Sequence, residues 1–369
     1  MSRIAYMDYN ATAPVFPSVA HAMSTAIAHV GNPSSVHRLG REARAMMEEA
    51  RESVADLVNV PRDWVIFTSG GTEADTLALK GSGCERVLVS AVEHAAVLKV
   101  RDDAEILPVD GNGIVDLGAL EAALKEDNRS ILVSVVAANN ETGVIEPIGE
   151  IVEIAHRYGA LVHCDAVQMA GKCEFDISAL DLDFASLSSH KIGGPQGVGA
   201  LIKREGLKLD AMFKGGGQER SMRGGTENLS GIVGFGAAAR EKVNFVEIQA
   251  LRDDLERQVK DLGGVVFGDQ VQRLPNTSYF ALVGMPSDRQ VMALDLANVM
   301  VSAGSACSSG KVKASHVLKA MKIEDDVANC AIRVSLGWNS SKEDVEMFVQ
   351  AWKKLVERVQ AKQTKSNAA

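Results

Sequence analysis

The sequence has few cysteines and histidines, the residues that cross-link small secreted domains or bind metal ions. It contains five cysteines, an odd number, and no two of them have a C-x-x-C spacing. Its eight histidines show no H-E-x-x-H or comparable ligand spacing. Both absences speak against a disulfide framework and a zinc site. We therefore expect no bound metal and a reducing compartment, the cytoplasm.

Long apolar runs and an excess of positive charge are also missing. The longest uninterrupted apolar run, residues 131–138, includes a serine and is far too short to span a bilayer. The first residues show no charged head followed by an apolar stretch, so no signal peptide is expected. The net charge of −9 argues against nucleic acid as the main partner. The sequence therefore predicts neither a membrane nor a nucleic acid as a direct partner.

The sequence does contain a regular alternation of short apolar runs and amphipathic segments. Strands are predicted at residues 64–67, 86–92, 131–138, 161–164, 184–187 and 199–202. Strands that alternate with helices favour a mostly parallel sheet covered on both faces, which is the α/β class. The 369 residues are enough for two domains.

The pattern changes after residue 244. A long helix comes first, and the strands predicted after it lie at residues 265–267, 276–283, 299–303 and 331–336. Such a mixture is typical of a smaller α+β domain. We therefore predict a large domain at residues 15–245 and a small domain made of residues 1–14 and 246–369.

Two helices carry their own start signals. Asn32-Pro-Ser-Ser35 is predicted to cap a helix whose buried stripe begins with Val36 and Leu39. Ser340-Ser-Lys-Glu343 is predicted as the capping box of the final helix. The tail from Gln360 is polar and is expected to fray.

The most informative stretch is the predicted strand at residues 184–187, which is followed by Ser188, Ser189, His190 and Lys191. A strand whose carboxyl end delivers a lysine into a loop presents a reactive amine to a crevice. Desolvation or a nearby cation can lower the pKa of such an amine, and the obvious product is a Schiff base with pyridoxal phosphate. For a lysine taken alone, a solvated surface residue is the more common interpretation.

A second stretch favours the pyridoxal interpretation. The predicted strand at residues 161–164 ends in Asp165, and Gln168 follows three residues later. An aspartate at a strand end usually caps the next helix. A pyridoxal enzyme, however, needs a carboxylate against the pyridinium nitrogen so that the ring can accept electrons. Asp165 and Gln168, followed by Lys191 on the next strand, fit that need.

With these residues, the chain resembles the cysteine desulfurases (NifS/IscS type) of the class-V aminotransferase family, from Tyr6-Met-Asp-Tyr-Asn-Ala-Thr12 to Arg333-Val-Ser-Leu-Gly337. The resemblance implies a fold-type I transferase that depends on pyridoxal 5'-phosphate, with a mostly parallel seven-stranded sheet and a smaller α+β domain. It implies conversion of L-cysteine to L-alanine, with the sulfur held as a persulfide on an active-site cysteine. An acceptor would then take the sulfur, such as an iron–sulfur scaffold or a carrier for tRNA thiolation.

Thr68-Ser-Gly-Gly-Thr-Glu73 follows a predicted strand and opens a helix, so it is the candidate phosphate cradle. Glycine lets the backbone approach an anion and the helix N-terminus supplies free N–H groups, which makes Gly71 and Thr72 the expected contacts. Ser188 and His190 would complete this site. A dinucleotide site is disfavoured because no G-x-G-x-x-G follows a strand and opens a helix.

Three further site residues rest mainly on the resemblance. His94 ends a predicted strand, where a structural and a catalytic role are equally open. The resemblance implies that His94 stacks on the cofactor ring and can shuttle a proton, and that Asn140 lies near the ring and the substrate. Arg333 would bind the substrate carboxylate through a bidentate pair, although arginines on strands are usually solvated.

The segment from Gly215 to Thr226 is too rich in glycine for a regular element, and a flexible surface loop is its simplest interpretation. It resembles the family segment that crosses a dimer interface, where Thr226 would bind the phosphate of the partner's cofactor. The resemblance therefore implies a homodimer with shared active sites.

Cys307 is the predicted sulfur acceptor. It stands among Ser, Gly and Ala, in a loop that can swing a thiol between a pocket and the surface. The loop resembles the longer cysteine loop of the NifS/IscS branch, although Ala314 stands where relatives often have proline. Aminotransferases and selenocysteine lyases share the fold and are the alternatives, but an aminotransferase needs no such loop. The other four cysteines are expected to be small core residues: Cys84, Cys164, Cys173 and Cys330.

Overall fold

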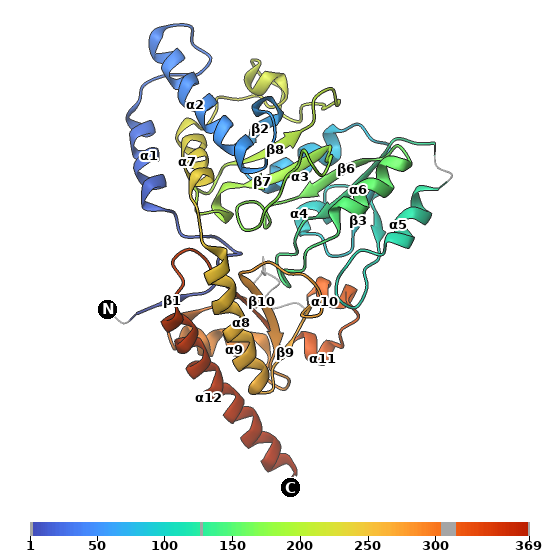
Figure 1. Cartoon of the computed structure of the whole chain (residues 1–369), viewed down its shortest axis with the longest axis vertical. Coiled ribbons are helices and arrows are strands. Elements are labelled where there is room, and N and C mark those ends of the chain that lie inside the picture. The colour runs from blue at the N-terminus through green and yellow to red at the C-terminus, as the bar shows by residue number, and fades with distance from the viewer. Residues whose placement is uncertain (1–2, 126–127, 304–314, 368–369) are drawn as a thin grey trace.

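The computed structural model describes residues 3–125, 128–303 and 315–367. Figure 1 shows a larger part built on a central sheet and, below it, a smaller part that ends in the long helix α12. The predicted sulfur acceptor Cys307 lies outside the described residues, together with its loop at 304–314. Within the described residues, no helix combines the length and the apolar character that a membrane span requires.

The larger part is built on a seven-stranded sheet. In spatial order its strands are β2 (Val65–Thr68), β8 (Gly199–Lys203), β7 (Phe184–Ser188), β6 (Leu161–Asp165), β5 (Ile131–Val136), β3 (Arg86–Ser90) and β4 (Glu105–Leu107). Strand β8 is antiparallel to β2 and β7, whereas the other neighbouring pairs are parallel. The predicted mostly parallel sheet of seven strands is therefore confirmed. The sequence does not predict β4, because three residues of which two are exposed show no periodic pattern.

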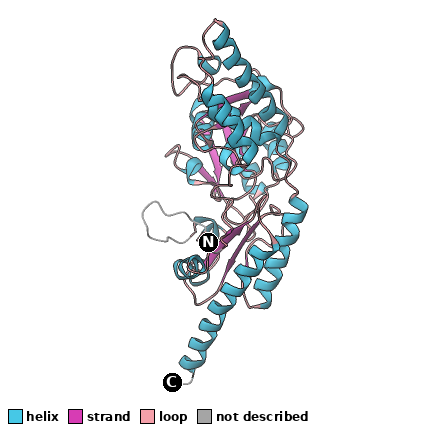
Figure 2. Ribbon diagram, turned by 90° about the vertical axis from the view of Figure 1, so that its left-hand side faces the viewer, coloured by secondary structure: helices cyan, strands magenta, loops and turns pink. Residues whose placement is uncertain are grey.

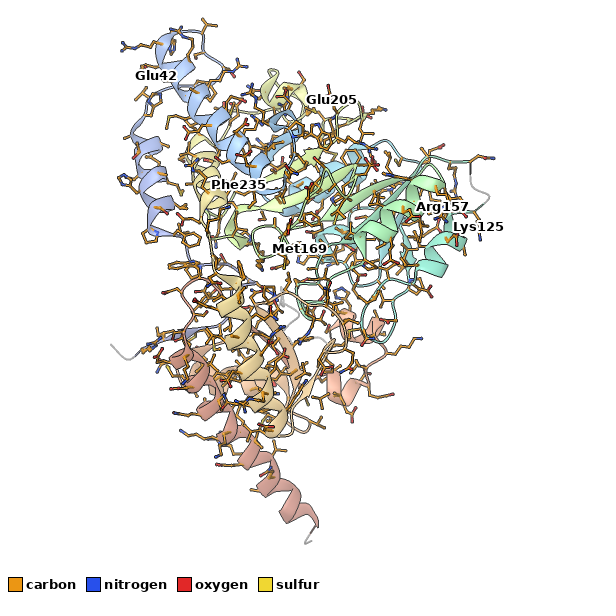
Figure 3. The ribbon with its side chains drawn as sticks, in the orientation of Figure 1. Glu42, Lys125, Arg157, Met169, Glu205 and Phe235 are labelled. Carbon is orange, nitrogen blue, oxygen red and sulfur yellow. The ribbon has the colours of Figure 1, made fainter. Side chains whose placement is uncertain are left out.

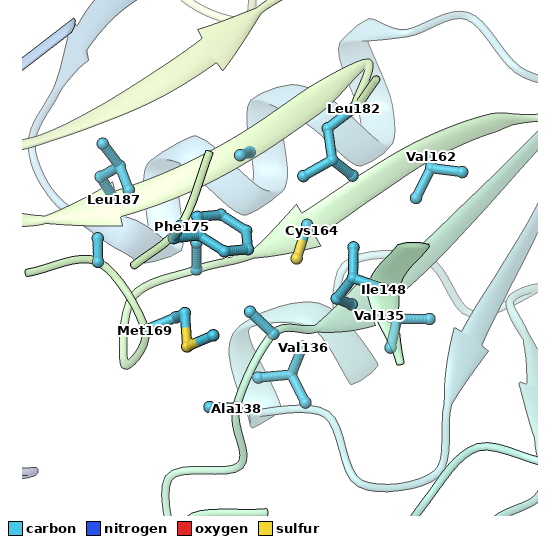
Figure 4. Close-up of a cluster of buried hydrophobic side chains, with 14 of the residues drawn as sticks. Val135, Val136, Ala138, Ile148, Val162, Cys164, Met169, Phe175, Leu182 and Leu187 are labelled. Carbon is cyan, nitrogen blue, oxygen red and sulfur yellow. The ribbon is translucent and has the colours of Figure 1, made fainter. Parts of the chain in front are cut away.

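Helices cover both faces of this sheet. One face packs against α3 (Gly71–Gly81) and α4 (Ala95–Leu98), and the other against α2 (Arg38–Leu57), α5 (Leu117–Leu124), α6 (Ile148–Arg157) and α7 (Leu229–Arg240), with α1 (Pro17–Ala28) on α7. Residues of β5 alternate between these cores, with Leu132 on the α3 side and Val133 and Val135 on the other. Figure 4 shows part of the second core, in which Val135 and Leu187 share a cluster with Ile148 of α6. Burial on both faces explains why these strands read as continuous apolar runs.

The smaller part contains a three-stranded antiparallel sheet in the order β12 (Ala331–Ser335), β10 (Thr277–Ala281), β9 (Val265–Val266). Its helices are α8 (Phe245–Asp261), α9 (Ser287–Asp295), α10 (His316–Ala320), α11 (Asp325–Ala328) and α12 (Lys342–Asn367). Phe280 of β10 packs edge-on against Phe348 and Trp352 of α12, with ring centroids 5.8 and 5.6 Å apart. These aromatic contacts fix the sheet on the helix. Figure 2 shows the far end of α12 extending away from the rest of the chain.

The N-terminal strand β1 (Ala5–Tyr6) lies in the smaller part, far from its neighbours in sequence. It pairs in parallel with β11 (Val299–Met300), and Met7 belongs to the same core cluster as Trp352. The chain then leads to α1 in the larger part, so residues 8–16 connect the two (Figure 1). The predicted domain boundaries, 15–245 for the large domain and 1–14 with 246–369 for the small one, stay a prediction.

The predicted start of α2 is wrong by a few residues. The helix begins at Arg38 and is capped by His37, whose Nδ1 accepts a hydrogen bond from the Gly40 backbone N–H at 3.2 Å. Ser35 is therefore not the cap, and Val36 is 88% exposed instead of buried. A Cβ on Gly40 would lie 2.2 Å from the Ser35 carbonyl oxygen. The missing side chain lets the segment before the helix fold back onto its first turn.

The start of α12 is also shifted, by one residue. Ser341 Oγ accepts from the Asp344 N–H at 3.3 Å, and Ser341 N–H donates to Asp344 Oδ2 at 2.9 Å. The capping box is therefore Ser341 with Asp344, not Ser340 with Glu343. The helix continues to Asn367, so the expectation of a frayed tail from residue 360 is wrong. Alanine, lysine and glutamine in that stretch are good helix formers.

Strand β2 forms an open edge of the sheet, and a buried ion pair closes it. Arg51 of α2 donates to both carboxylate oxygens of Glu219 at 2.8 Å, and the two residues are 2% and 6% exposed. The same pair satisfies β2: Val65 O accepts from Arg51 Nη1 at 2.9 Å, and Phe67 N–H donates to Glu219 Oε2 at 2.9 Å. A strand edge would otherwise present unpaired backbone groups to a second chain.

The glycine-rich loop is held in shape by these contacts. It contains the turn η3 (Gln218–Ser221), in which Glu219, Arg220 and Ser221 have φ values of 45°, 56° and 65°. Left-handed backbone of this kind is costly for residues other than glycine. Arg220 Nη2 also donates to Val65 O at 2.6 Å. Side-chain bonds to the sheet edge, rather than the glycines alone, therefore define the loop.

We expect Glu219→Gln to lower the free energy of unfolding by about 3–5 kcal/mol, because Arg51 stays buried and keeps only the partly exposed Glu48, at 3.3 Å, as a charged partner. Urea unfolding at a fixed protein concentration measures the loss. The matched control is Glu42→Gln. Glu42 pairs with Arg38 at 3.6 Å on the surface, in the first turns of α2 (Figure 3). That variant should lose less than about 1 kcal/mol. Equal losses in the two variants would contradict a special role for the buried pair.

Candidate active site

A cavity of about 520 Å³ lies at the carboxyl ends of the parallel strands, between the larger and the smaller part. Ligands of α/β sheets bind at this end. Strands β6 and β7 are neighbours, and they end in Asp165 and in Ser188. The strand ends therefore bring Asp165 and the residues after Ser188 to one edge of the sheet.

Of the twelve predicted site residues, ten line this cavity. They are Gly71, Thr72, His94, Asn140, Asp165, Gln168, Ser188, His190, Lys191 and Arg333. Thr226 does not line it and is exposed on the glycine-rich loop. Cys307 lies outside the described residues. The geometry thus groups ten predicted residues in one place, and their individual roles stay predictions.

Lys191 lies at the end of the turn η2 (Ser189–Lys191), which follows β7. Its Nζ donates to the backbone oxygens of Asn10 at 2.6 Å and Ala11 at 3.0 Å. Burial lowers the pKa of Lys191 from 10.5 to about 8, and the positive charge of Arg333 acts in the same direction. Near neutral pH, a fraction of this amine is therefore unprotonated and nucleophilic.

Three buried carboxyl residues line the cavity, Asp75, Glu141 and Asp165, and the pKa is shifted at Asp75 and at Asp165. Burial raises the pKa of Asp165 to about 6, while a hydrogen bond from the Val167 N–H at 3.0 Å and the charge of Lys191 oppose the rise. Burial, and then the charge of Asp165, raise the pKa of Asp75 of α3 well above its usual range. Two neighbouring carboxyls in a dry site do not both ionise readily. Asp165, which has Lys191 nearby, therefore carries the charge and Asp75 holds a proton.

Two histidines at the cavity are neutral at pH 7. His94 caps α4, and its Nδ1 accepts from the Ala96 N–H at 3.1 Å, so the proton of the neutral ring is on Nε2. Burial lowers the pKa of His94, and the charge of Lys191 adds to this. Burial also lowers the pKa of His190 to about 4. Neither ring therefore adds a positive charge beside Lys191.

The N-terminus of α3 has the form of a phosphate cradle. Gly70, just before the helix, has φ of 155°, which favours glycine. A Cβ on Gly71 would lie 2.8 Å from a methyl group of Val167. Because both side chains are absent, the first N–H groups of the helix are open to the cavity, which Gly71 and Thr72 line. An anion with several acceptor oxygens fits this end of the cavity.

Arg333 reaches the cavity from the opposite side, on β12. Its Nη1 donates to the Asn140 carbonyl at 3.0 Å and its Nη2 to Asp8 Oδ1 at 2.7 Å. Its Nε is buried and has no hydrogen-bond partner within the described part of the chain. Buried donors are usually paired. Because Arg333 lines the cavity, its guanidinium is placed near any small carboxylate that enters there.

Sequence reasoning misses several residues at the cavity. Asp8 and Asn10 lie in the stretch that carries the family resemblance, but no spacing connects them to Lys191. His316 of α10 lines the cavity and its Nε2 bonds to the Glu93 carbonyl at 2.9 Å, a contact across more than 200 residues. The sequence does contain a signal for Asp75. It lies four residues after Gly71, and therefore on the same face of the predicted helix as the candidate phosphate contacts.

The lowered pKa of Lys191 has a direct consequence for its reactivity. In the full-length, cofactor-free chain, we expect the rate of Lys191 acetylation by trace acetic anhydride to rise with a midpoint near pH 8. Only the unprotonated amine reacts, and an ordinary lysine has a pKa of about 10.4. Peptide mass spectrometry follows each lysine separately, so the other lysines are internal standards. A midpoint at the ordinary value would contradict the burial of this amine.

Known proteins resemble this chain in sequence and in overall structure. The family "Aminotransferase class-V" matches residues 5–348. The chain is 39% identical over 380 residues to "Cysteine desulfurase IscS" of Dictyoglomus turgidum (97% of this chain, 96% of that protein) and 41% identical over 383 residues to "Cysteine desulfurase" of Cereibacter sphaeroides (98% and 97%). A NifS-like protein from Rickettsia africae has a similar structure, with a TM-score of 0.89 and 34% sequence identity; the match covers 96% of this chain and 100% of that one. The structure of SspA in complex with cysteine is also similar, with a TM-score of 0.81 and 28% sequence identity; the match covers 91% of this chain and 100% of that one. The chain therefore belongs to the class-V aminotransferase family.

Proposed function

We propose that this protein is a pyridoxal-phosphate-dependent cysteine desulfurase, which converts L-cysteine to L-alanine and transfers the sulfur to its own Cys307. The observation that carries the proposal is the cavity that brings together the Lys191 amine, the Asp165 carboxylate and the N-terminus of α3. Two relatives that match this chain over nearly its whole length are named cysteine desulfurases, and the similar SspA structure contains cysteine.

The cavity fits pyridoxal phosphate in charge and shape. The open N-terminus of α3 suits the phosphate, and the charged Asp165 suits the protonated ring nitrogen. The residues that would hold the cofactor are Gly71, Thr72, Ser188 and His190 at the phosphate and His94, Asn140, Asp165, Gln168 and Lys191 at the ring. When bound, the cofactor supplies an electron sink for the bond changes at the substrate carbon.

The chain's own residues would bind the substrate and move its protons. Arg333, which lines the cavity, binds the carboxylate of L-cysteine. Lys191 takes the proton from the substrate carbon, because a pKa of about 8 suits a general base near neutral pH. His94, which lines the cavity, is neutral and carries its hydrogen on Nε2, so it can donate a hydrogen bond from that atom.

Cys307 would complete the reaction as a nucleophile. Its thiolate attacks the sulfur of the substrate, so that an S–S bond forms while the C–S bond of the substrate breaks. The carbon fragment takes up a proton and leaves as L-alanine, and the sulfur stays as a persulfide on the enzyme. The acceptor we propose is a protein of iron–sulfur cluster assembly or tRNA thiolation, in the cytoplasm.

Replacement of the thiol separates the two halves of this chemistry. Cys307→Ser should still bind the cofactor and change its visible absorption when L-cysteine is added, because the cavity residues are intact. It should form no persulfide and release almost no alanine, since a hydroxyl is a far weaker nucleophile towards sulfur. The matched control is Cys173→Ser, which changes another cysteine that is not fully buried.

Alanine and sulfide are quantified together in the presence of a thiol reductant. Near-normal turnover in Cys307→Ser, or its loss in Cys173→Ser, would move the sulfur-accepting role elsewhere. Amino transfer to a keto acid would identify an aminotransferase instead, and a strong preference for selenocysteine would identify a selenocysteine lyase.

We also propose a homodimer with shared active sites. The glycine-rich loop is tied to the phosphate end of the cavity, because Arg223 donates to Glu73 of α3 at 2.8 Å. Beside it, Met212 and Phe213 are 42% and 56% exposed. Exposed apolar side chains that border a site favour contact with another chain. Thr226, exposed on the same loop, would then reach the phosphate in the partner's cavity.

Mixing two inactive variants tests this arrangement. Lys191→Ala and Thr226→Ala affect different ends of one shared site, so a mixed dimer of the two should regain at most one working site of its two. We expect alanine release to return after verified subunit exchange, to about a quarter of the wild-type rate if exchange is random. Each variant alone, treated in the same way, is the control. No recovery after exchange would mean that each chain has a self-contained site.

A further inference from the structure

A second lysine, Lys172, is buried next to the candidate active site. It is 6% exposed and lies four residues after Gln168, in the turns that follow β6. Its Nζ donates to Asn10 Oδ1 at 2.9 Å and to Gln168 Oε1 at 2.6 Å. The ion pairs found in the described residues include none with Lys172. The mechanism proposed above gives this amine no role.

The hydrogen-bond partners of Lys172 match an uncharged amine. A neutral amine offers two N–H groups, and an ammonium offers three. Two amide oxygens accept from Nζ, and the charges that act on it are the cations Lys191 and Arg333, opposed only by the thiol of Cys173. Burial, and then these two cations, lower the pKa of Lys172 well below its usual range. Both the donor count and the surroundings favour the neutral form.

The two amides that Lys172 contacts determine the position of one backbone carbonyl. Gln168 Nε2 donates to the Asn10 carbonyl at 2.9 Å, and the same oxygen accepts from Lys191 Nζ at 2.6 Å. The Asn10 side chain is in turn held from the smaller part, because Asn276 Nδ2 donates to its Oδ1 at 3.1 Å. Lys172 thus donates to both amides around the acceptor of the Lys191 amine, and it shares Asn10 Oδ1 with Asn276.

We propose that Lys172 is a positioning residue for the active site: as an uncharged amine, it orients the Asn10 and Gln168 amides and thereby fixes the carbonyl that holds Lys191. The carbonyl dipole stabilises the charged form of Lys191. Removal of the Lys172 N–H groups takes away the donor to Gln168 Oε1 and one of the two donors to Asn10 Oδ1, and so weakens that interaction. The acidity of Lys191 should therefore increase.

A cationic Lys172 would act in the opposite direction. Its positive charge would repel the charged form of Lys191, so that its removal would raise the pKa of Lys191. The other groups that act on Lys191 would be unchanged: Arg333 on β12, Asp165 on β6 and Asp8 in the N-terminal segment. The two neutral histidines, His94 and His190, border the same space. The direction of the shift therefore separates positioning from a charge effect.

The test compares variants by competitive acetylation of Lys191 in the full-length, cofactor-free chain. Lys172→Met should lower the midpoint by about half a pH unit, roughly threefold in acid dissociation constant. Lys172→Gln is one bond shorter but keeps two N–H donors without a charge, so it should move the midpoint back towards the wild-type value. The matched control is Lys203→Met, because Lys203 also donates to two carbonyls, of Arg204 at 3.2 Å and Leu207 at 2.9 Å, but outside the cavity.

A lower midpoint in Lys172→Met with recovery in Lys172→Gln supports the proposal. A raised midpoint, an unchanged midpoint in folded protein, or no recovery in Lys172→Gln overturns it. If Lys172→Met fails to fold, Asn10→Ala removes one acceptor of Lys172, together with the bonds of the Asn10 side chain to Asn140 and Thr277, and must also lower the midpoint. The inference rests on Lys191 as the reactive amine of the proposed function. The measurement needs neither cofactor nor substrate, so its outcome is independent of desulfurase activity.

Discussion

The burial of several ionisable groups around one amine is the constraint on which the rest of this site depends. Lys191, Asp165, Asp75 and Arg333 lie at a cavity between two apolar cores, where each isolated charge would be costly. They are tolerated because opposite charges face each other and because carbonyls accept from the cations. Removal of any one of them changes the protonation of its neighbours, since all share the same poorly hydrated space. The raised pKa of Asp165 and the lowered pKa of Lys191 are two consequences of this one arrangement.

The sequence predicts the residues that stand at strand ends, because a parallel sheet collects those ends at one edge. Asp165 and Lys191 follow neighbouring strands, and an apolar run followed by a polar residue reveals each of them. The same reasoning cannot find Asn10 or His316, whose neighbours in the fold are distant in sequence. Local errors have local causes: Gly40 lets the chain fold back before α2, and the short β4 has no pattern of its own. Side-chain partners set by tertiary contact are thus the part that sequence reasoning loses.

The glycine-rich loop illustrates the same limit in another way. Its composition predicts an irregular segment, and its backbone is irregular, with three consecutive residues other than glycine at positive φ. The composition does not show that Glu219 anchors it to Arg51 and to the open edge of the sheet. A loop held by a buried ion pair is more sharply defined than a free glycine-rich linker. Such definition is required if an exposed residue of the loop is to serve a site in another chain.

The segment at residues 8–11 couples the two parts of the molecule at the reactive amine. Asp8 accepts from Arg333 of the smaller part, and the carbonyls of Asn10 and Ala11 accept from Lys191 of the larger part. The proposed carboxylate-binding residue and the proposed base are therefore tied to the same few residues of backbone. A displacement of the smaller part would move Arg333 and the acceptors of Lys191 together. If Arg333 binds the substrate carboxylate, as proposed, that binding would influence how firmly the amine is held, without any direct contact between the two cations.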